Sequence, residues 1–202
     1  MRQKYACGWL LLWWGVYFTL YFLTERLIPM DACHEIHTPL DDKIPFCEWF
    51  VIFYVGWYGL VVGSLVWLLI RDPPAFCKLQ TYIILVQMMA TVVYVIYPSY
   101  QNLRPQTFPR ENALTELVGL LYKIDTPTGV FPSLHVAISI ALISTWLRER
   151  QVCVWVRGGI ILFCLLVILS VSFVKQHSVL DILGAIPICL LTEWLIFAEI
   201  TD

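Results

Sequence analysis

Long apolar runs alternate with polar segments along this chain, and only the last run contains acidic residues, Asp181 and Glu193. The runs cover residues 6–23, 49–70, 79–97, 131–147, 158–174 and 178–198. A helix needs about 20 mostly apolar residues to cross the hydrocarbon core of a bilayer. The pattern therefore predicts an all-α, polytopic membrane protein with six transmembrane helices, in a single membrane domain over residues 1–202. Large residues fill the end of the first run, which favours a retained span over a cleaved signal peptide.

Two longer polar segments, residues 24–45 and 98–130, follow the first and third runs and therefore lie on the same side of the membrane. Within the second, residues 112–125 place apolar side chains on one helical face, which predicts a short interfacial helix. The apolar positions are Leu114, Leu117, Val118 and Leu121. Basic residues crowd the short loops on the other side, so we expect both termini to be cytoplasmic and the two polar segments extracytoplasmic.

The composition agrees with an integral membrane protein. Apolar residues make up 59% of the chain and charged residues only 14%, against about 25% charged in soluble domains. This excludes a soluble enzyme and a disordered chain, and the net charge of −2 gives no signal for nucleic-acid binding. The seven cysteines show no Cys-x-x-Cys pair, so we expect small buried apolar residues rather than a disulfide framework or a zinc site.

Two histidines occupy the same membrane face at the ends of two predicted spans. His135 lies in Phe-Pro-Ser-Leu-His at the start of the fourth span, and His177 lies in Lys-Gln-His-Ser at the start of the sixth. Asp181 follows His177 by four residues, so both side chains share one helical face. A carboxylate fixes the tautomer of an imidazole, and a positioned imidazole acts as base or nucleophile. These three residues are therefore candidate catalytic groups.

Positive charge is predicted beside the histidines. Arg104 lies in the second polar segment, and Lys175 precedes His177 by two residues. Arginine grips phosphate oxygens through two parallel hydrogen bonds, whereas lysine acts as a point charge. The region of Ser133, at a helix N-terminus, adds backbone N–H donors that favour an anion. Together these residues indicate a phosphate-binding site.

Three blocks of residues resemble the signature of the type 2 phosphatidic-acid phosphatase superfamily. The family pattern has Lys, six residues and Arg-Pro, then Pro-Ser-Gly-His, then Ser-Arg, five residues, His, three residues and Asp, on a six-helix membrane core. The matching positions are Arg104-Pro105, then Pro132, Ser133 and His135, then Ser170, His177 and Asp181. The likeness covers about residues 45–198, which we interpret as the catalytic core.

Three positions depart from that pattern. Tyr97 stands where the family has Lys, Leu134 replaces the Gly, and Val171 replaces the Arg. Two phosphate-binding cations of the family are therefore absent, and Lys175 is a candidate substitute. Spare cations of the same polar segment are Arg110 and Lys123. The Phe-Pro-Ser-Leu-His form is similar to the branch that includes the inositol-phosphoceramide synthases, which transfers phosphoryl headgroups between lipids.

The resemblance implies a mechanism and partners. His177 would attack phosphorus while Asp181 orients its ring, and His135 would protonate the leaving lipid hydroxyl as the phosphohistidine forms. Water as acceptor gives a lipid phosphatase, and a lipid or polyol acceptor gives a phosphotransferase. The family implies no cofactor and no metal, with a lipid phosphate as substrate in contact with membrane lipids. We expect a location in a bacterial cell membrane with an extracytoplasmic site, while the lipid and the oligomeric state stay open.

Other interpretations of the polar residues stay open at this point. Two histidines on different spans could ligate haem, which a Soret band would reveal. A transport protein is another class, although no broken-helix repeat supports it. In the first polar segment, Asp31, His34 and His37 could form a weak metal site, but the histidine spacing is not that of a zincin.

Overall fold

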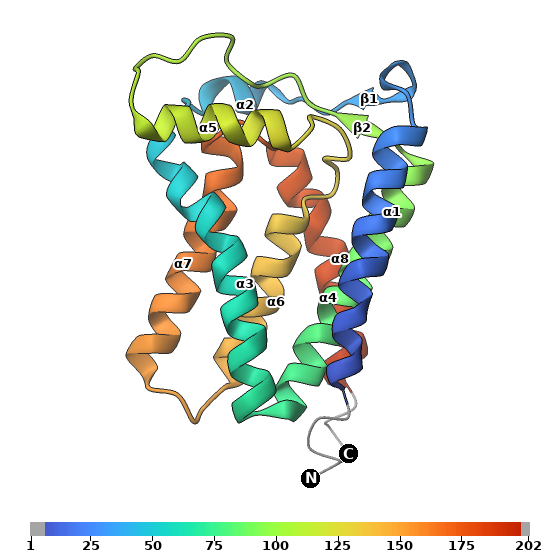
Figure 1. The fold of residues 1–202 in the computed structure, drawn as a ribbon, viewed down its shortest axis with the longest axis vertical. Coiled ribbons are helices and arrows are strands. Elements are labelled where there is room, and N and C mark those ends of the chain that lie inside the picture. Colours follow the sequence, from blue (N-terminus) through green and yellow to red (C-terminus); the bar gives the residue numbers. More distant parts are fainter. Residues whose placement is uncertain (1–6, 199–202) are drawn as a thin grey trace.

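The computed structural model describes residues 7–198, which form long helices covered at one end by a polar layer (Figure 1). The long helices are α1 (Trp13–Leu27), α3 (Val51–Arg71), α4 (Pro73–Ile96), α6 (Leu134–Arg148), α7 (Val154–Phe173) and α8 (Val179–Phe197). The layer contains α2 (Pro39–Lys43), α5 (Ala113–Ile124) and the parallel two-residue strands β1 (His34–Glu35) and β2 (Ser99–Tyr100). Short 3-10 helices cover Gly8–Leu12, Met30–Ala32 and Glu48–Phe50.

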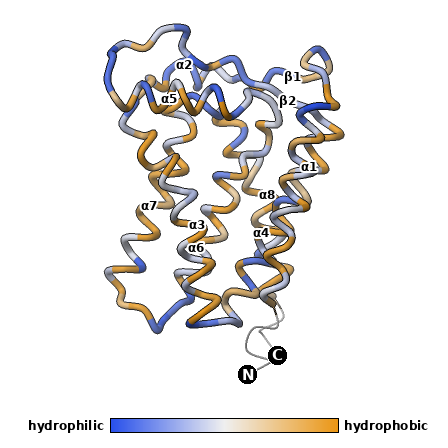
Figure 2. Tube along the Cα trace, viewed as in Figure 1, coloured by the Kyte–Doolittle hydropathy of each residue, from blue (hydrophilic) through white to orange (hydrophobic). Residues whose placement is uncertain are grey.

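Helix α6 is the central element of the bundle. It packs against α3, α4, α7 and α8, and most of its side chains are buried. The large apolar side chains of the outer helices instead point away from the bundle and are exposed in the isolated chain. Figure 2 shows the matching pattern, with hydrophobic residues along the helices and hydrophilic residues gathered in the layer of α2 and α5 and at the opposite ends. An apolar exterior of this kind requires an apolar solvent, as a bilayer provides.

Four helices in the described part of the chain are long and apolar enough to cross a membrane. They are Glu48–Arg71, Pro73–Ile96, Val154–Phe173 and Val179–Phe197. Helices α1 and α6 each have 15 residues and fall short of that length. In α6 the reason is local, because Pro132 and the cap residue Ser133 delay the helix until Leu134, although the apolar run begins at residue 131. The mostly helical membrane fold is confirmed, whereas six spans stay a prediction.

The helix expected at residues 112–125 is observed as α5. The Asn112 side chain accepts hydrogen bonds from the backbone N–H groups of Leu114 and Thr115, which satisfies two of the first free donors of the helix. Its buried residues Val118 and Leu121 lie on the face that packs onto the bundle. Helix α5 thus lies across the end of the bundle at which α6 begins (Figure 1).

The expectation that the cysteines are simple buried apolar residues is wrong for Cys153, which is exposed, and for the pair Cys7 and Cys77. Cys7 and Cys77 form a disulfide that ties the segment before α1 to the first turns of α4. Their Cα atoms are 5.7 Å apart although 70 residues separate them in sequence. Spacing along the chain gave no signal for this pair, because only the packing of α1 on α4 brings the two residues together. Among the free cysteines, Cys164 and Cys189 are buried as expected.

Candidate active site

The structure brings the three candidate catalytic residues together beneath the polar layer. His135 lies in the first turn of α6, and His177 lies in the turn that joins α7 to α8. Asp181 lies in the first turn of α8. The two imidazole rings have their centroids 6.0 Å apart. Groups from two helices therefore face one another as the sequence predicts.

The turn between α7 and α8 aims His177 back into the bundle. Helix α7 ends at Phe173, and Lys175 then adopts a left-handed backbone conformation with φ of 55°. The backbone N–H groups of Gln176 and His177 both donate to the carbonyl oxygen of Val171, at 2.9 and 3.0 Å. These bonds close the end of α7 and place His177 directly before the cap of α8. Its side chain is consequently almost buried, with 8% of the residue exposed.

Two acceptors hold one nitrogen of the His177 ring. Nδ1 lies 3.1 Å from Asp181 Oδ2 and 3.1 Å from the carbonyl oxygen of Val130. Because both neighbours are hydrogen-bond acceptors, the proton of the neutral ring belongs on Nδ1. The lone pair then lies on Nε2, which is the form that a nucleophilic imidazole requires.

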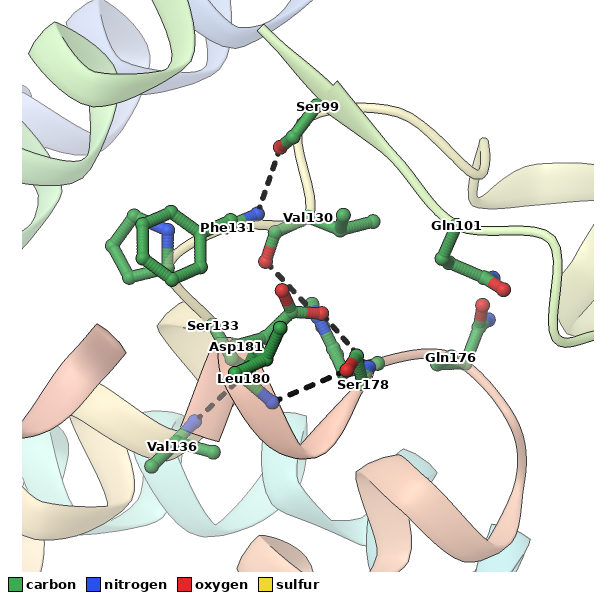
Figure 3. A network of polar contacts seen from close by, with 12 residues as sticks. Ser99, Gln101, Val130, Phe131, Ser133, Val136, Gln176, Ser178, Leu180 and Asp181 are labelled. Carbon is green, nitrogen blue, oxygen red and sulfur yellow. Dashed lines mark hydrogen bonds and ion pairs between the residues drawn. The ribbon is translucent and has the colours of Figure 1, made fainter. Parts of the chain in front are cut away.

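Asp181 is itself held by the start of its helix. The Ser178 backbone N–H donates to Asp181 Oδ2 at 2.9 Å, and the Ser178 hydroxyl accepts from Leu180 N at 3.2 Å, in a capping box (Figure 3). The Ser133 backbone N–H donates to the Asp181 carbonyl oxygen at 3.1 Å and so joins the starts of α6 and α8. Asp181 is fully buried, so the orientation of its carboxylate is fixed by these contacts.

Aromatic rings surround His135. Its ring stacks on Tyr54 at 4.2 Å and contacts Trp57 at 4.3 Å between centroids, and Tyr58 meets it edge-on at 5.8 Å. Among the described residues no side chain or backbone group bonds the buried Nε2 atom of His135. The ring is therefore held by packing, and one of its nitrogens is available to a substrate.

Arg104 reaches the site from the polar segment before α5. Its guanidinium donates to the carbonyl oxygens of Tyr122 and Asp125, at 3.1 and 2.9 Å, and to Gln176 Oε1 at 2.5 Å. Burial lowers the pKa of the Arg104 guanidinium, although nearby Asp125 acts in the opposite direction. Arg104 is thus next to the residue that precedes His177, in agreement with the predicted basic group at this face.

Lys175 points in a different direction. Its ammonium group donates to the carbonyl oxygens of Asp41 and Ile44, at 2.7 and 2.5 Å. It lines a separate polar hollow of about 500 Å³ beside α2, together with His37 and Asp42. Burial lowers the pKa of the Lys175 ammonium, and the nearby carboxylates oppose that effect. The structure does not bring the Lys175 ammonium into the space between the histidines.

The remaining predicted phosphate-site residues divide between buried and surface positions. Ser133 is buried, caps α6, and accepts a hydrogen bond from Val136 N at 3.5 Å. Arg110 is an exposed residue that pairs with Glu48 at 3.3 Å. Lys123 is exposed in the last turn of α5. Neither spare cation lines the cavity at the histidines, and Arg104 and Ser133 are not among its lining residues either.

The first polar segment holds no three-residue metal cluster within residues 7–198. His37 Nε2 instead pairs with Asp42 Oδ1 at 2.9 Å, and this hydrogen bond raises the pKa of the His37 imidazole. The ring of His34 stacks on Tyr97 with centroids 4.5 Å apart. Asp31 lies in the 3-10 helix Met30–Ala32.

Two polar residues near the site were not predicted from the sequence. The amide of Gln176 faces that of Gln101, which follows β2 (Figure 3), and both residues are buried. Their Nε2 atoms, like Arg104 Nε, have no hydrogen-bond partner among the described residues. Buried N–H donors usually find partners, so this group of donors suits an anionic ligand. The position of Gln176 next to His177 was the available signal.

A large apolar cavity begins at the histidines. Its volume is about 660 Å³, and His135, His177 and Gln176 lie among its lining residues. Half of the remaining lining residues are apolar and aromatic side chains of α1 and α3. A polar reactive end joined to an apolar cavity is the arrangement expected for an amphiphilic ligand.

These features define a helical membrane protein with a histidine-containing site at the mouth of an apolar cavity. The model of the PAP2 superfamily matches residues 22–195, and the chain belongs to that superfamily. The resemblance found in the three sequence blocks is thereby confirmed. Members of the superfamily are generally phosphatases, so membership indicates a phosphatase-type activity on lipid phosphates. No curated protein and no solved structure matches the chain.

Proposed function

We propose that the protein is an integral-membrane lipid phosphatase that hydrolyses a phosphomonoester or diphosphate of a lipid through a phosphohistidine. The observation that carries the proposal is the geometry of His177. Its Nδ1 is held by Asp181 at 3.1 Å, and its ring faces His135 at 6.0 Å. This is a nucleophile with an orienting carboxylate and a second imidazole for proton transfer.

The proposed reaction has two steps. His177 Nε2 attacks phosphorus, the bond from phosphorus to the lipid oxygen breaks, and His135 donates a proton to that oxygen. His135 then accepts a proton from water, whose oxygen attacks the phosphohistidine and releases phosphate and free His177. Asp181 stabilises the positive charge that the His177 ring gains in the first step and loses in the second.

Phosphate binding is assigned to the buried donors around His177. Arg104 supplies positive charge, and the free N–H groups of Arg104, Gln176 and Gln101 supply hydrogen bonds. Fixed donors in a site shielded from water stabilise developing negative charge strongly. The Ser133 backbone N–H already bonds the Asp181 carbonyl oxygen, so it is the first turn of α6 after Ser133 that adds backbone donors. Lys175 acts, in this proposal, as a structural cation beside α2, since carbonyl oxygens already surround its ammonium group.

Phosphotransfer to a second lipid or a polyol is the alternative. The observation in its favour is the small exposed fraction of His177, which limits the approach of water to the phosphohistidine. A purified sample assayed on a panel of lipid phosphates, with and without alcohol acceptors, separates the two. Release of inorganic phosphate supports the phosphatase, whereas transfer to the alcohol without release supports the alternative. A panel without turnover under either condition contradicts both.

The membrane arrangement is part of the proposal. Helices α1 and α6 complete six spans by crossing together with their flanking residues, and α5 lies at the interface on the extracytoplasmic side. The basic loops at the opposite end support cytoplasmic termini.

The Cys7–Cys77 disulfide offers a test of this orientation. Disulfides rarely persist in a reducing cytosol. If that end of the bundle is cytoplasmic, both residues should be free thiols in intact cells and should react with a membrane-permeant maleimide after unfolding, without prior reduction. Mass spectrometry of the labelled peptides provides the measurement. A pair that reacts only after reduction would place this end on the oxidising side.

Replacing Arg104 should weaken both binding and catalysis. In Arg104→Lys a point charge replaces a planar group that makes three hydrogen bonds, so Gln176 and the phosphate both lose directed donors. We expect KM to rise and kcat to fall, with kcat/KM lower by roughly 100-fold. Steady-state kinetics in detergent, with Arg110→Lys as the exposed control, provide the measurement. Equal kinetics for the two variants would contradict a role of Arg104 in phosphate binding.

Activity should survive chelation of divalent ions. In the proposed reaction His177 supplies the nucleophile that a metal-bound water would otherwise provide. We expect phosphate release to change less than about twofold after dialysis against EDTA. Complete loss, restored by one particular divalent ion, would contradict the mechanism and direct attention to Asp31, His34 and His37.

A further inference from the structure

The cavity at the histidines continues deep into the bundle. Helix α3 lines it with seven residues from Trp57 to Leu69, spaced as one helical face. Leu69 follows Trp57 by twelve residues, which corresponds to a depth of about 18 Å, since a helix rises about 1.5 Å per residue. On the other side, the lining begins at Leu11, just before α1, and runs along α1 to Phe22. The cavity is therefore long and lined mostly by apolar side chains.

One side of this cavity opens outward between α1 and α3. Phe18 and Phe22 of α1 line it and are about half exposed, at 49% and 58%. Val62 and Val66 of α3 do the same, at 60% and 51%. Since these side chains face both the cavity and the surroundings, a ligand can pass between the two helices from the hydrocarbon region of a bilayer.

The far end of the cavity is held by specific contacts. Trp13 Nε1 donates to Gln87 Oε1 at 2.8 Å, joining α1 to α4 beside the lining residues Trp14 and Gln87. Gln80 Nε2 of α4 donates to the carbonyl oxygen of Leu10, the residue before Leu11, at 3.4 Å. These hydrogen bonds fix the position of Leu11 at the deep end and limit the length of any occupant.

We propose that this cavity holds one aliphatic chain of the phosphorylated lipid, and that its deep end at Leu11 and Leu69 sets the chain length. The inference rests on the proposed function, because the phosphate must lie at His177. A depth of about 18 Å is close to half of the roughly 30 Å hydrocarbon core, which is the length of one leaflet. A second chain of the same lipid remains in the bilayer through the opening between α1 and α3.

Binding of alkyl phosphonates tests the proposal without requiring turnover. These compounds carry a phosphate-like group that is not hydrolysed, and a series from hexyl to hexadecyl can be titrated into the full chain in nanodiscs. We expect affinity to increase at least about tenfold from hexyl to dodecyl, because more apolar surface is packed in the cavity. Beyond the chain that fills the cavity, affinity should level off.

Two filling variants should shorten the cavity by different amounts. Leu69→Trp blocks the deep end and should weaken binding of hexadecyl phosphonate at least about tenfold while leaving the hexyl compound unchanged. Val62→Trp, about two helical turns nearer the histidines, should also weaken binding of the dodecyl compound. The matched control is Ile70→Trp, since Ile70 is exposed on the same helix and does not line the cavity.

The outcomes separate this inference from the proposed function. Equal affinity for all chain lengths, or equal effects of Leu69→Trp and Ile70→Trp, would overturn the chain-binding role even in an active phosphatase. Chain-length-dependent binding in a protein without phosphatase activity would support the chain site and contradict the proposed function.

A second, independent observation concerns Asp41, a buried carboxylate of α2 that is 2% exposed. Its Oδ2 accepts from the Ser178 hydroxyl at 2.6 Å and from Thr38 N at 2.8 Å. Its Oδ1 accepts from Val179 N at 2.8 Å. Ser178 and Val179 directly follow His177, and they lie 137 and 138 positions from Asp41 in sequence.

The same short helix also contacts the chain before His177. The carbonyl oxygen of Asp41 accepts from the Lys175 ammonium. Helix α2 therefore holds the chain on both sides of the proposed nucleophile. The Ser178 backbone N–H continues this network to Asp181 Oδ2. We infer that Asp41 is a positioning residue, which acts through Ser178 and Val179 to keep His177 and Asp181 in their reactive orientation.

Asp41→Asn and Asp42→Asn form a matched pair for the test. Asp41→Asn keeps nearly the same side-chain shape but removes one of the two accepting oxygens, whereas Asp42 is exposed and pairs only with His37 among the described residues. For Asp41→Asn we expect kcat to fall roughly 10- to 100-fold with KM within about twofold, because a small displacement of a reacting group lowers the rate strongly. Asp42→Asn should match the wild type.

Further readouts distinguish positioning from loss of folding. The thermal midpoint and the yield of folded protein are measured beside activity. For Asp41→Asn, any loss of folded protein should be smaller than the loss in kcat. Ser178→Ala should also lower kcat, and the losses in the double variant should be less than additive, since the two residues share one hydrogen bond while Asp41 also holds Val179. Equal kcat for Asp41→Asn and Asp42→Asn, or additive losses in the double variant, would overturn the inference.

Discussion

His177→Ala is expected to lower kcat by at least about 10⁴-fold, because the variant lacks the nucleophile on which both proposed steps depend. The fold should persist, since the residues that organise the turn use backbone groups of Gln176 and His177 rather than the imidazole. Activity per folded protein in detergent, with the thermal midpoint as a check on folding, provides the measurement.

The matched control for this variant is His37→Ala. His37 belongs to the polar layer and pairs with the exposed Asp42, away from the cavity at the histidine pair. It should retain wild-type kinetics. If His177→Ala turns over as fast as His37→Ala, the nucleophilic role of His177 is contradicted.

His135→Ala should slow turnover of alkyl phosphates by roughly 100- to 10,000-fold, the usual contribution of a general acid. The lipid oxygen leaves poorly without a proton, and the aromatic cage of Tyr54, Trp57 and Tyr58 supplies no replacement acid. A nitrophenyl phosphate that carries an alkyl chain of the same length releases nitrophenolate, which leaves without a proton. The rate of its first step should therefore fall less than about tenfold. Burst kinetics on the two substrates provide the measurement.

The two substrates decide the role of His135. An equal loss on both would indicate that the residue holds the phosphate or the site geometry instead of donating a proton. Tyr54→Phe serves as the packing control, because it keeps the stacked ring beside His135 and removes only the hydroxyl that bonds Asp125.

The local parts of the site could be predicted from the sequence because they depend on short spacings. His177 and Asp181 are four residues apart, and the helix that follows places them on one face as expected. The α5 helix also followed from local signals, since Asn112 is a favourable cap before an apolar periodic segment.

Lys175 illustrates where spacing fails. It precedes His177 by two residues, which suggests a common site. In the structure α7 has already ended at Phe173, and the left-handed turn at Lys175 sends its side chain toward α2. Whether a side chain before a helix points into a site depends on the turn that joins it to the helix, and no periodicity describes such a turn.

Long-range pairs could not be predicted at all. The Cys7–Cys77 disulfide and the Asp41–Ser178 hydrogen bond join residues 70 and 137 positions apart. Each depends on how whole elements pack, α1 on α4 in the first case and α2 over the start of α8 in the second. The role of Asp41 in the first polar segment could therefore not be inferred until its partner Ser178 was known.

Trapping the covalent intermediate tests the central claim most directly. Wild-type protein is mixed with a lipid phosphate carrying labelled phosphorus, quenched in alkali within milliseconds, and its peptides are mapped by mass spectrometry. We expect an acid-labile label on His177 that reaches a steady level during turnover and is absent from His177→Ala. Turnover without any labelled protein, or a label on a residue other than His177, would contradict the phosphohistidine mechanism.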